Sequence, residues 1–178
     1  MILVTGGAGF VGRHLLRALK TEREDVPLRV LDAQELPGNL AADVHLVRGL
    51  VHEPDDVAKS VADVDVVIHL AAKVEPDSRD FESMWRVNVE GTRILHSSAV
   101  AAGCARFLYV SSSGVYGQPR SAHPFTEDDE PRPVTPYQRT KLEAENVLRR
   151  SLVPTTSVNI LRPAGLTKVL VGSRAPSL

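Results

Sequence analysis

The sequence predicts an α/β fold in which helices cover both faces of a doubly wound parallel sheet. Two observations support this prediction. Short apolar runs alternate with helical patterns along the chain, as they do in repeated strand-helix-strand units. Several of the runs, such as residues 64–70, are almost continuously apolar, which is typical of strands that are covered by helices on both faces.

The expected elements follow this alternation in order. One long helix should run from about residue 79 to residue 102, because its apolar residues recur on one face. The other expected helices end near residue 20, begin near residue 54 and span about 136–150. The expected strands are residues 2–5, 28–31, 44–47, 64–70, 106–110 and 157–161.

Length and composition indicate one globular domain that acts on small molecules. The chain has 178 residues, of which 43% are hydrophobic, and its formal net charge is -1. Charges of both signs are interspersed, so neither nucleic acid nor an anionic membrane is an expected partner. The single cysteine, Cys104, excludes an internal disulfide, and the histidines are too scattered to predict a metal site.

The placement of the apolar runs favours a cytoplasmic protein. The first strand begins at residue 2, which leaves no room for a secretory signal. No apolar run approaches the ~20 residues that a membrane span requires. We therefore expect a cytoplasmic location.

A glycine-rich turn joins the first strand to the first helix. Gly6 allows a tight turn, Gly9 lets backbone amides approach a pyrophosphate, and Gly12 lets the helix pack closely on the strand. The unpaired amides of the helix N-terminus then face the phosphates. The sequence therefore predicts a Rossmann fold that binds a dinucleotide.

An acidic residue, Asp32, follows 20 residues beyond Gly12. Its carboxylate can accept hydrogen bonds from both ribose hydroxyls of NAD. A 2′-phosphate at the same place would meet a like charge, which costs about 1 to 4 kcal/mol. NAD is therefore the expected cofactor, in preference to NADP.

Tyr137 and Lys141 lie four residues apart at the start of the predicted helix 136–150, so they should share one helix face. A phenol beside an ammonium forms an acid-base pair. Free tyrosine has a pKa near ~10, and a pKa of ~7 requires about 4 kcal/mol of support for the phenolate. One positive charge at ~4 Å supplies about that much at an effective dielectric of ~20, so we expect Lys141 to lower the pKa of Tyr137.

Five ordered motifs, together with Asp32, resemble the extended short-chain dehydrogenase/reductase family, which includes NAD-dependent epimerases and dehydratases and 3-beta-hydroxysteroid dehydrogenases. The resemblance covers residues 1–165, the expected NAD-binding Rossmann domain, and leaves 166–178 as a divergent short tail. The motifs are residues 5–12, 65–72, 88–92, 111–117 and 137–141.

The resemblance implies a role for each matching residue. Ser112 lies four residues before the tyrosine of Val115-Tyr116-Gly117, which selects it from three consecutive serines as the catalytic hydroxyl. Tyr137 is implied as the general acid/base, and Lys141 as its partner at the nicotinamide ribose. The implied cofactor-binding residues are Gly6, Gly9, Phe10, Val11, Gly12, Asp32, Ala71, Ala72, Asn88, Tyr137 and Lys141.

The chain departs from the family pattern at two places. Gly49-Leu50 stands where relatives usually carry a Gly-Asp pair that contacts the adenine, so weaker adenine binding is expected. The C-terminal lobe that binds substrate in relatives is missing, which would leave the nicotinamide and Tyr137 facing water. The uncovered sheet edge would also allow a second copy of the chain to pair as a homo-dimer.

Two functional hypotheses follow. The first is an NAD-dependent epimerase/dehydratase-type oxidoreductase that acts on a secondary alcohol or ketone, with a nucleotide sugar and a steroid-like alcohol both open as the small-molecule substrate. The second is a non-catalytic NAD-binding module or an inactive truncated form.

Overall fold

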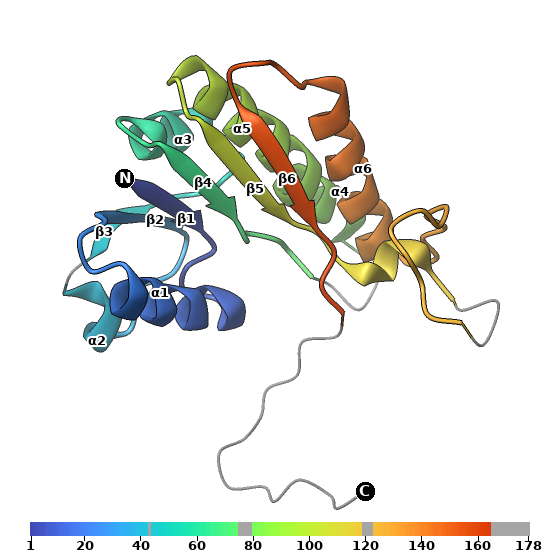
Figure 1. The fold of residues 1–178 in the computed structure, drawn as a ribbon, viewed down its shortest axis with the longest axis horizontal. Coiled ribbons are helices and arrows are strands. Elements are labelled where there is room, and N and C mark those ends of the chain that lie inside the picture. The colour runs from blue at the N-terminus through green and yellow to red at the C-terminus, as the bar shows by residue number, and fades with distance from the viewer. Residues whose placement is uncertain (43, 75–79, 119–122, 165–178) are drawn as a thin grey trace, which may run out of the picture.

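The computed structural model describes residues 1–42, 44–74, 80–118 and 123–164. These residues form a six-stranded parallel sheet with the strand order β3-β2-β1-β4-β5-β6 (Figure 1). The predicted doubly wound parallel sheet is therefore confirmed. The strands are β1 (Ile2–Thr5), β2 (Leu28–Asp32), β3 (Val44–Arg48), β4 (Val66–His69), β5 (Arg106–Val110) and β6 (Ser157–Leu161).

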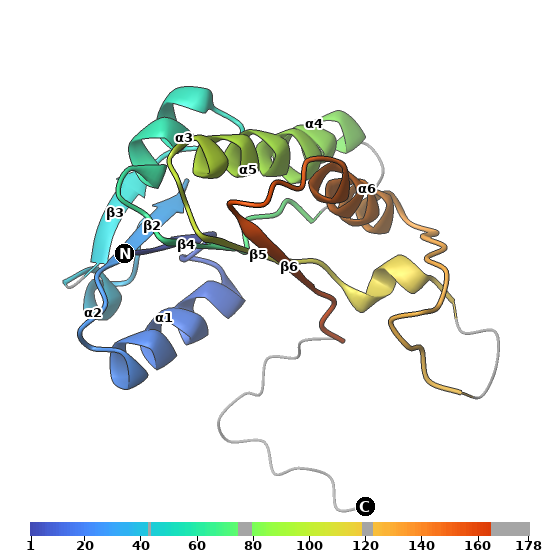
Figure 2. The ribbon, with the colours of Figure 1, turned by 45° about the horizontal axis from the view of Figure 1, so that its top comes forward.

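The helices are divided between the two faces of the sheet (Figure 2). One face carries α1 (Phe10–Glu22) and α2 (Gly38–Ala41). The opposite face carries α3 (Pro54–Val61), α4 (Phe81–Trp85), α5 (Gly91–Ala101) and α6 (Pro136–Arg150). Because the chain winds outward in both directions from β1 and β4, the strand order reverses there, and folds of this kind bind ligands at that point.

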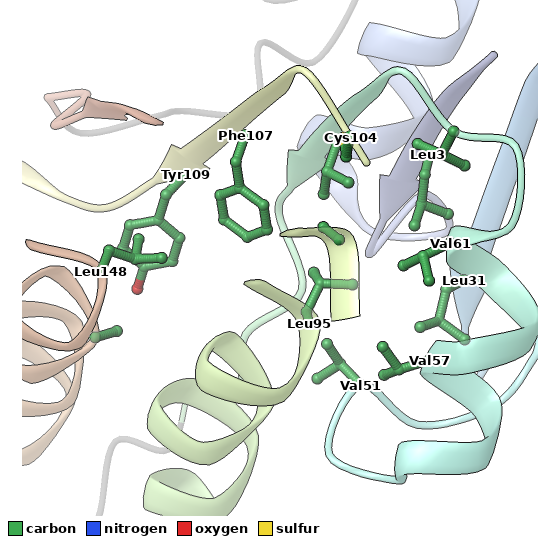
Figure 3. Close-up of a cluster of buried hydrophobic side chains, with 14 residues drawn as sticks. Leu3, Leu31, Val51, Val57, Val61, Leu95, Cys104, Phe107, Tyr109 and Leu148 are labelled. Atoms are coloured by element: carbon green, nitrogen blue, oxygen red, sulfur yellow. The ribbon is translucent and has the colours of Figure 1, made fainter. Parts of the chain in front are cut away.

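Each face of the sheet has its own apolar core, because neighbouring residues of a strand point to opposite sides. Leu3 belongs to the core beneath α3, α5 and α6, whereas Val4 belongs to the core beneath α1. In the first core, Phe107 and Tyr109 of β5 lie beside Leu148 of α6 (Figure 3). This packing holds α6 against the end of β5, where the predicted serines lie.

The expected long helix is confirmed over residues 81–101, which are helical without a break. It consists of α4, a π-helical segment over Arg86–Glu90, and α5. A π-helical turn inserts extra backbone into the helix and often occurs at functional sites. The sequence did not predict this turn, because a single widened turn leaves the apolar pattern almost unchanged.

The strand β6 has a hydrogen-bonded neighbour on one side only within the described part of the chain. Its residues alternate, with Val158 and Ile160 packed against the core under α6, and Leu161 50% exposed on the other face. The expected uncovered sheet edge is therefore present in these residues. The predicted tail, residues 166–178, lies outside the described residues.

No helix among the described residues is long and apolar enough to cross a membrane.

Candidate functional site

The glycine-rich turn between β1 and α1 is packed too tightly to accept side chains. Gly6 has φ +73°, and a Cβ on Gly12 would lie 2.3 Å from the Gly6 carbonyl oxygen. A Cβ on Gly6 would lie 2.7 Å from the backbone nitrogen of Ala71, in the segment that follows β4. The turn is thus wedged between the first turn of α1 and the exit of β4.

The N-terminus of α1 is open to an anion. Its N-cap, Gly9, provides no side-chain cap, and the first turn carries no acidic residue. The unpaired amides and the helix dipole therefore remain available for a phosphate. This arrangement fits the diphosphate of a dinucleotide.

Asp32 fastens this turn to the end of β2. Its Oδ2 accepts a hydrogen bond of 2.8 Å from the amide of Ala8, and its Oδ1 accepts one of 2.9 Å from the amide of Gln34. Each carboxylate oxygen can accept more than one hydrogen bond, so these contacts orient Asp32 and leave acceptor capacity for ribose hydroxyls.

A cleft of about 470 Å³ opens above the carboxyl ends of the central strands. Five of the predicted cofactor-binding residues line it: Gly6, Gly9, Asp32, Ala71 and Ala72. The glycine turn, an acidic residue at the end of β2 and two small residues beyond β4 therefore meet at one cavity. The residues present fit a bound dinucleotide.

Asn88 links the wall of this cleft to α6. Its Oδ1 accepts from the backbone amide of Lys73 at 2.7 Å, and its Nδ2 donates to the Lys73 carbonyl and to Thr140 Oγ1, both at 2.9 Å. Asn88 is 1% exposed, so it supports the cleft from behind. Thr140 lies between Tyr137 and Lys141, which ties the predicted acid-base pair to the cleft wall.

The start of α6 is fixed by a capping box. Thr135 Oγ1 accepts from the amide of Gln138 at 3.2 Å, and Gln138 Oε1 accepts from the amide of Thr135 at 3.1 Å. Tyr137 consequently lies in the first turn of α6 and Lys141 one turn later.

Lys141 points toward the end of β5. It is 2% exposed, its Nζ donates a 2.6 Å hydrogen bond to the Val110 carbonyl, and Nζ lies 4.4 Å from the centre of the Tyr109 ring. Burial lowers the pKa of Lys141 to about 7, although the carboxylate of Glu145 acts in the opposite direction. Lys141 is thus poised to change charge near neutral pH.

The expected low pKa of Tyr137 is not found. Burial raises the pKa of the Tyr137 phenol above its ordinary value. The physical reason lies in the direction of Lys141, whose ammonium is directed to the Val110 carbonyl and whose own charge is weakened by burial. The Tyr137 phenol is therefore protonated at neutral pH.

The three serines after β5 have different environments. Ser111 is 4% exposed and its hydroxyl donates to the buried carboxylate of Glu145 at 2.6 Å. Ser112 is only partly buried, and its Oγ accepts from the amide of Gly114 at 3.1 Å, where it caps a 3₁₀ helix over Ser113–Tyr116. Ser111 is occupied by the interior, so the structure favours Ser112 over Ser111 as the hydroxyl that meets a ligand.

Comparison with protein families gives a match over almost the whole described chain. The model of the "NAD dependent epimerase/dehydratase family" matches residues 2–165. The chain belongs to this family. The sequence prediction of the family is thereby confirmed, and the Rossmann core described above is its NAD-binding domain.

Individual members of the family show the same relation. The uncharacterized protein y4nG of Sinorhizobium fredii is 35% identical over 150 residues, which cover 84% of this chain and 37% of that protein. A short-chain dehydrogenase/reductase superfamily protein from Agrobacterium tumefaciens, solved with bound NAD, superposes with a TM-score of 0.81 at 36% identity, covering 91% of this chain and 48% of its own. MoeE5, solved with UDP-glucuronic acid and NAD, has a TM-score of 0.80 at 34% identity, and the match covers 90% of this chain and 53% of MoeE5. The chain thus spans about half, or less, of these members.

The remaining predicted residues are not among those that line the cleft. Phe10 is 37% exposed at the start of α1, Val11 is partly buried beside it, and Gly12 is buried against the turn. Lys141 reaches the end of β5 through the Val110 carbonyl, and Ser112 follows that strand. The start of α6 lies near Ser112, because an added Cβ on Gly114 would touch both Ser112 and Gln138. Direct cofactor contact by these residues remains a prediction.

Sequence reasoning missed part of the cleft. It did not predict the lining residues Leu31, Ala33, Gln34, Val51, His52, Leu70, Lys73 and Val87. Gly49 and Leu50, which the sequence analysis placed at the adenine, also line the cleft, and Leu50 is 42% exposed. The Leu50 amide donates to Asp56 Oδ2 at 3.0 Å, so a carboxylate from α3 lies next to this position.

Replacing Gly12 with alanine should damage both the fold and the cleft. The added Cβ would lie 2.3 Å from Gly6 O and 2.6 Å from Gly7 Cα, and backbone cannot move aside cheaply. We expect a loss of about 1 to 3 kcal/mol of unfolding free energy, measured by urea denaturation, and a loss of NAD+ binding by calorimetry. Gly38→Ala is the matched control, because an added Cβ there meets nothing within 4 Å. Equal effects of the two substitutions would contradict the interpretation of the turn.

Proposed function

We propose that this chain is the cofactor-binding and proton-transfer half of an NAD-dependent oxidoreductase that acts on a secondary alcohol of a nucleotide sugar. One observation carries the proposal. The cleft lined by Gly6, Asp32 and Ala71 is joined through Asn88 and Thr140 to the helix that carries Tyr137 and Lys141.

The cofactor half of the proposal depends on the cleft. The amides at the start of α1 would hold the diphosphate. The Asp32 carboxylate would accept hydrogen bonds from the ribose hydroxyls, and the small side chains of Ala71 and Ala72 would leave room for the dinucleotide. A bound nicotinamide supplies the acceptor and donor of a hydride at the carbinol carbon. The carboxylate of Asp32 favours NAD over NADP.

The proton-transfer half depends on α6. Tyr137 would exchange the proton of the reacting hydroxyl through its phenol oxygen, and Ser112 would orient the same substrate oxygen. The raised pKa of Tyr137 keeps the phenol protonated at neutral pH, which suits protonation of a ketone. For the reverse direction, the positive charge of Lys141 would stabilise the phenolate if its ammonium turned from the Val110 carbonyl toward Tyr137.

The nucleotide-sugar class is supported by relatives. MoeE5 was solved with UDP-glucuronic acid and NAD, and UDP-glucose 4-epimerase 3 of Oryza sativa is 35% identical over 165 residues. The human 3 beta-hydroxysteroid dehydrogenase type 7 is 34% identical over 159 residues, so a steroid alcohol is the second candidate substrate.

The test uses the purified chain with NAD+ and a panel of UDP-glucose, UDP-glucuronic acid, dTDP-glucose and a 3-beta-hydroxysteroid. NADH absorbance reports net oxidation, and chromatography of the sugars reports epimerisation or dehydration without net NADH. We expect NAD+ binding by calorimetry and turnover of one nucleotide sugar. Turnover of the steroid alone would replace the substrate class. Tight NAD+ binding without any turnover would support the non-catalytic module, and no binding at millimolar NAD+ would overturn the whole proposal.

A further inference from the structure

A buried carboxylate lies one helical turn beyond Lys141. Glu145 is fully buried, and its Oε1 accepts hydrogen bonds from Ser111 Oγ at 2.6 Å and from Arg162 Nε at 3.0 Å. Its Oε2 accepts from a second Arg162 nitrogen at 2.6 Å and lies 3.1 Å from a nitrogen of Arg149. Arg162 also donates to the Tyr116 hydroxyl at 2.6 Å.

These contacts join the two segments that carry the proposed reactive groups to the exit of β6. Glu145 belongs to α6, as do Tyr137 and Lys141. Ser111 immediately precedes Ser112, and Arg162 immediately follows β6. One carboxylate therefore fixes the end of β5 and the exit of β6 against the face of α6 that presents Lys141.

The carboxylate also determines the charge around Lys141. The titratable groups that act on Lys141 or are acted on by it are Glu145 on its own helix, Tyr109 on β5 and His69 on β4. Tyr137 lies one helical turn before it on α6. Of these, Glu145 is the group held as an anion, because hydrogen bonds from Arg162 and Ser111 outweigh its burial and keep its pKa below the ordinary value. Arg162 and Arg149 lie on the far side of the Glu145 carboxylate, and their positive charges disfavour the charged form of Lys141.

We propose that Glu145 is a positioning residue, clamped by Arg162, that keeps the Lys141 ammonium charged and holds the Ser111–Ser112 segment in place beside it. The proposal rests on the proposed function, because it assigns Glu145 a task through Lys141 and Ser112. Because Glu145 is fully buried and paired with Ser111, Arg162 and Arg149, it would act through these neighbours and not by touching substrate or cofactor.

The direction in which the Lys141 titration midpoint moves distinguishes the loss of the Glu145 charge from a general loosening of the structure. Glu145→Gln removes the negative charge and leaves Arg162 in place, so the Lys141 midpoint should fall by about one to two pH units. Arg162→Gln removes a positive charge and leaves the carboxylate, so the midpoint should rise. Loosening by either substitution would let in water and move both midpoints upward, toward the ordinary lysine value.

The measurement is an NMR titration of the lysine side-chain nitrogens. The chain has five lysines, so the spectra are simple, and Lys141→Arg assigns the signal. Glu143→Gln is the matched control on the same helix, because Glu143 pairs with Arg150 at the surface. It should leave the Lys141 midpoint unchanged.

Glu145→Gln leaves Arg162 without its partner in the interior, and the variant could fail to fold. The double variant Glu145→Gln with Arg162→Gln removes both charges together, and its midpoint is compared with that of Arg162→Gln alone. A lower midpoint in the double variant supports the proposal. An unchanged or higher midpoint in Glu145→Gln, or in the double variant relative to Arg162→Gln, overturns it.

A calorimetric NAD+ titration of the same samples keeps the two proposals apart. If the wild-type chain binds no NAD+, the proposed function fails, whereas the Lys141 midpoints still decide the charge assigned to Glu145. If NAD+ binds and the midpoints do not respond, only the role of Glu145 is lost. In an active chain, the acid limb of the pH profile should move with the Lys141 midpoint, and Glu145→Asp should partly restore it.

Discussion

The fold is expected to lose stability in acid through the buried His69. This histidine ends β4 without any exposed surface, and its ring nitrogens lie 2.6 Å from Thr5 Oγ1 and 2.9 Å from Thr92 Oγ1. Burial, with a smaller contribution from Lys141, lowers its pKa from 6.5 to about 3. Between these two pKa values, His69 is therefore protonated in the unfolded chain and neutral in the folded chain.

The pH window follows from these two values. Above pH 6.5 the imidazole is neutral in both states, and its contribution to stability is complete. As the pH falls from 6.5 toward 3, the unfolded state gains its proton and the free energy of unfolding drops by up to about 5 kcal/mol. Burial also lowers the pKa of His96, so a smaller loss occurs in the same direction.

Urea denaturation at a series of pH values measures this effect. His69→Gln should lower stability at pH 7, because the pair of threonine contacts is disturbed, and should flatten the decline between pH 6.5 and 4. His14→Gln, at an exposed position of α1, should leave the decline unchanged. If His69→Gln and the wild-type chain decline with equal slopes, the buried neutral histidine is not the cause.

The second large effect is expected at Tyr137. Tyr137→Phe removes one hydroxyl from a partly buried ring, so the fold and NAD+ affinity should change little. Without the phenol proton, turnover of the proposed nucleotide-sugar substrate should fall about 10²- to 10⁴-fold, which corresponds to about 3 to 5 kcal/mol in the barrier.

The readout is the split between kcat and NAD+ affinity. A fall in kcat with unchanged calorimetric affinity supports proton transfer by Tyr137, whereas equal losses in both would point to a structural role. Ser113→Ala is the control for a missing hydroxyl nearby, since Ser113 contributes its backbone amide to Pro163. Retention of full turnover in Tyr137→Phe would remove the phenol from the mechanism.

Local signals predicted the elements that hold the site. The helix α6 begins at Pro136 because Thr135 and Gln138 form its capping box and proline suits the first helical position, all of which are visible in the sequence. The strands β5 and β6 end where expected, because their apolar runs are bounded by polar or turn residues.

Tertiary contacts decided the features that could not be predicted. The spacing of Tyr137 and Lys141 placed them on one helix face, but the direction of the ammonium depends on the Val110 carbonyl, which comes from another element. The pair formed by Glu145 and Arg162 joins residues from α6 and the exit of β6. No local pattern reports that these two side chains meet.

Within the described residues, β6 pairs with a strand on one side only, and this affects how the chain can associate with other copies. A strand edge that no described residue pairs, flanked by an exposed Leu161, can pair with another strand. Self-association should therefore grow with concentration and begin at this edge, far from the dinucleotide cleft at β1 and β4. Association through β6 can thus remove molecules from solution while the molecules that stay in solution keep their dinucleotide cleft intact.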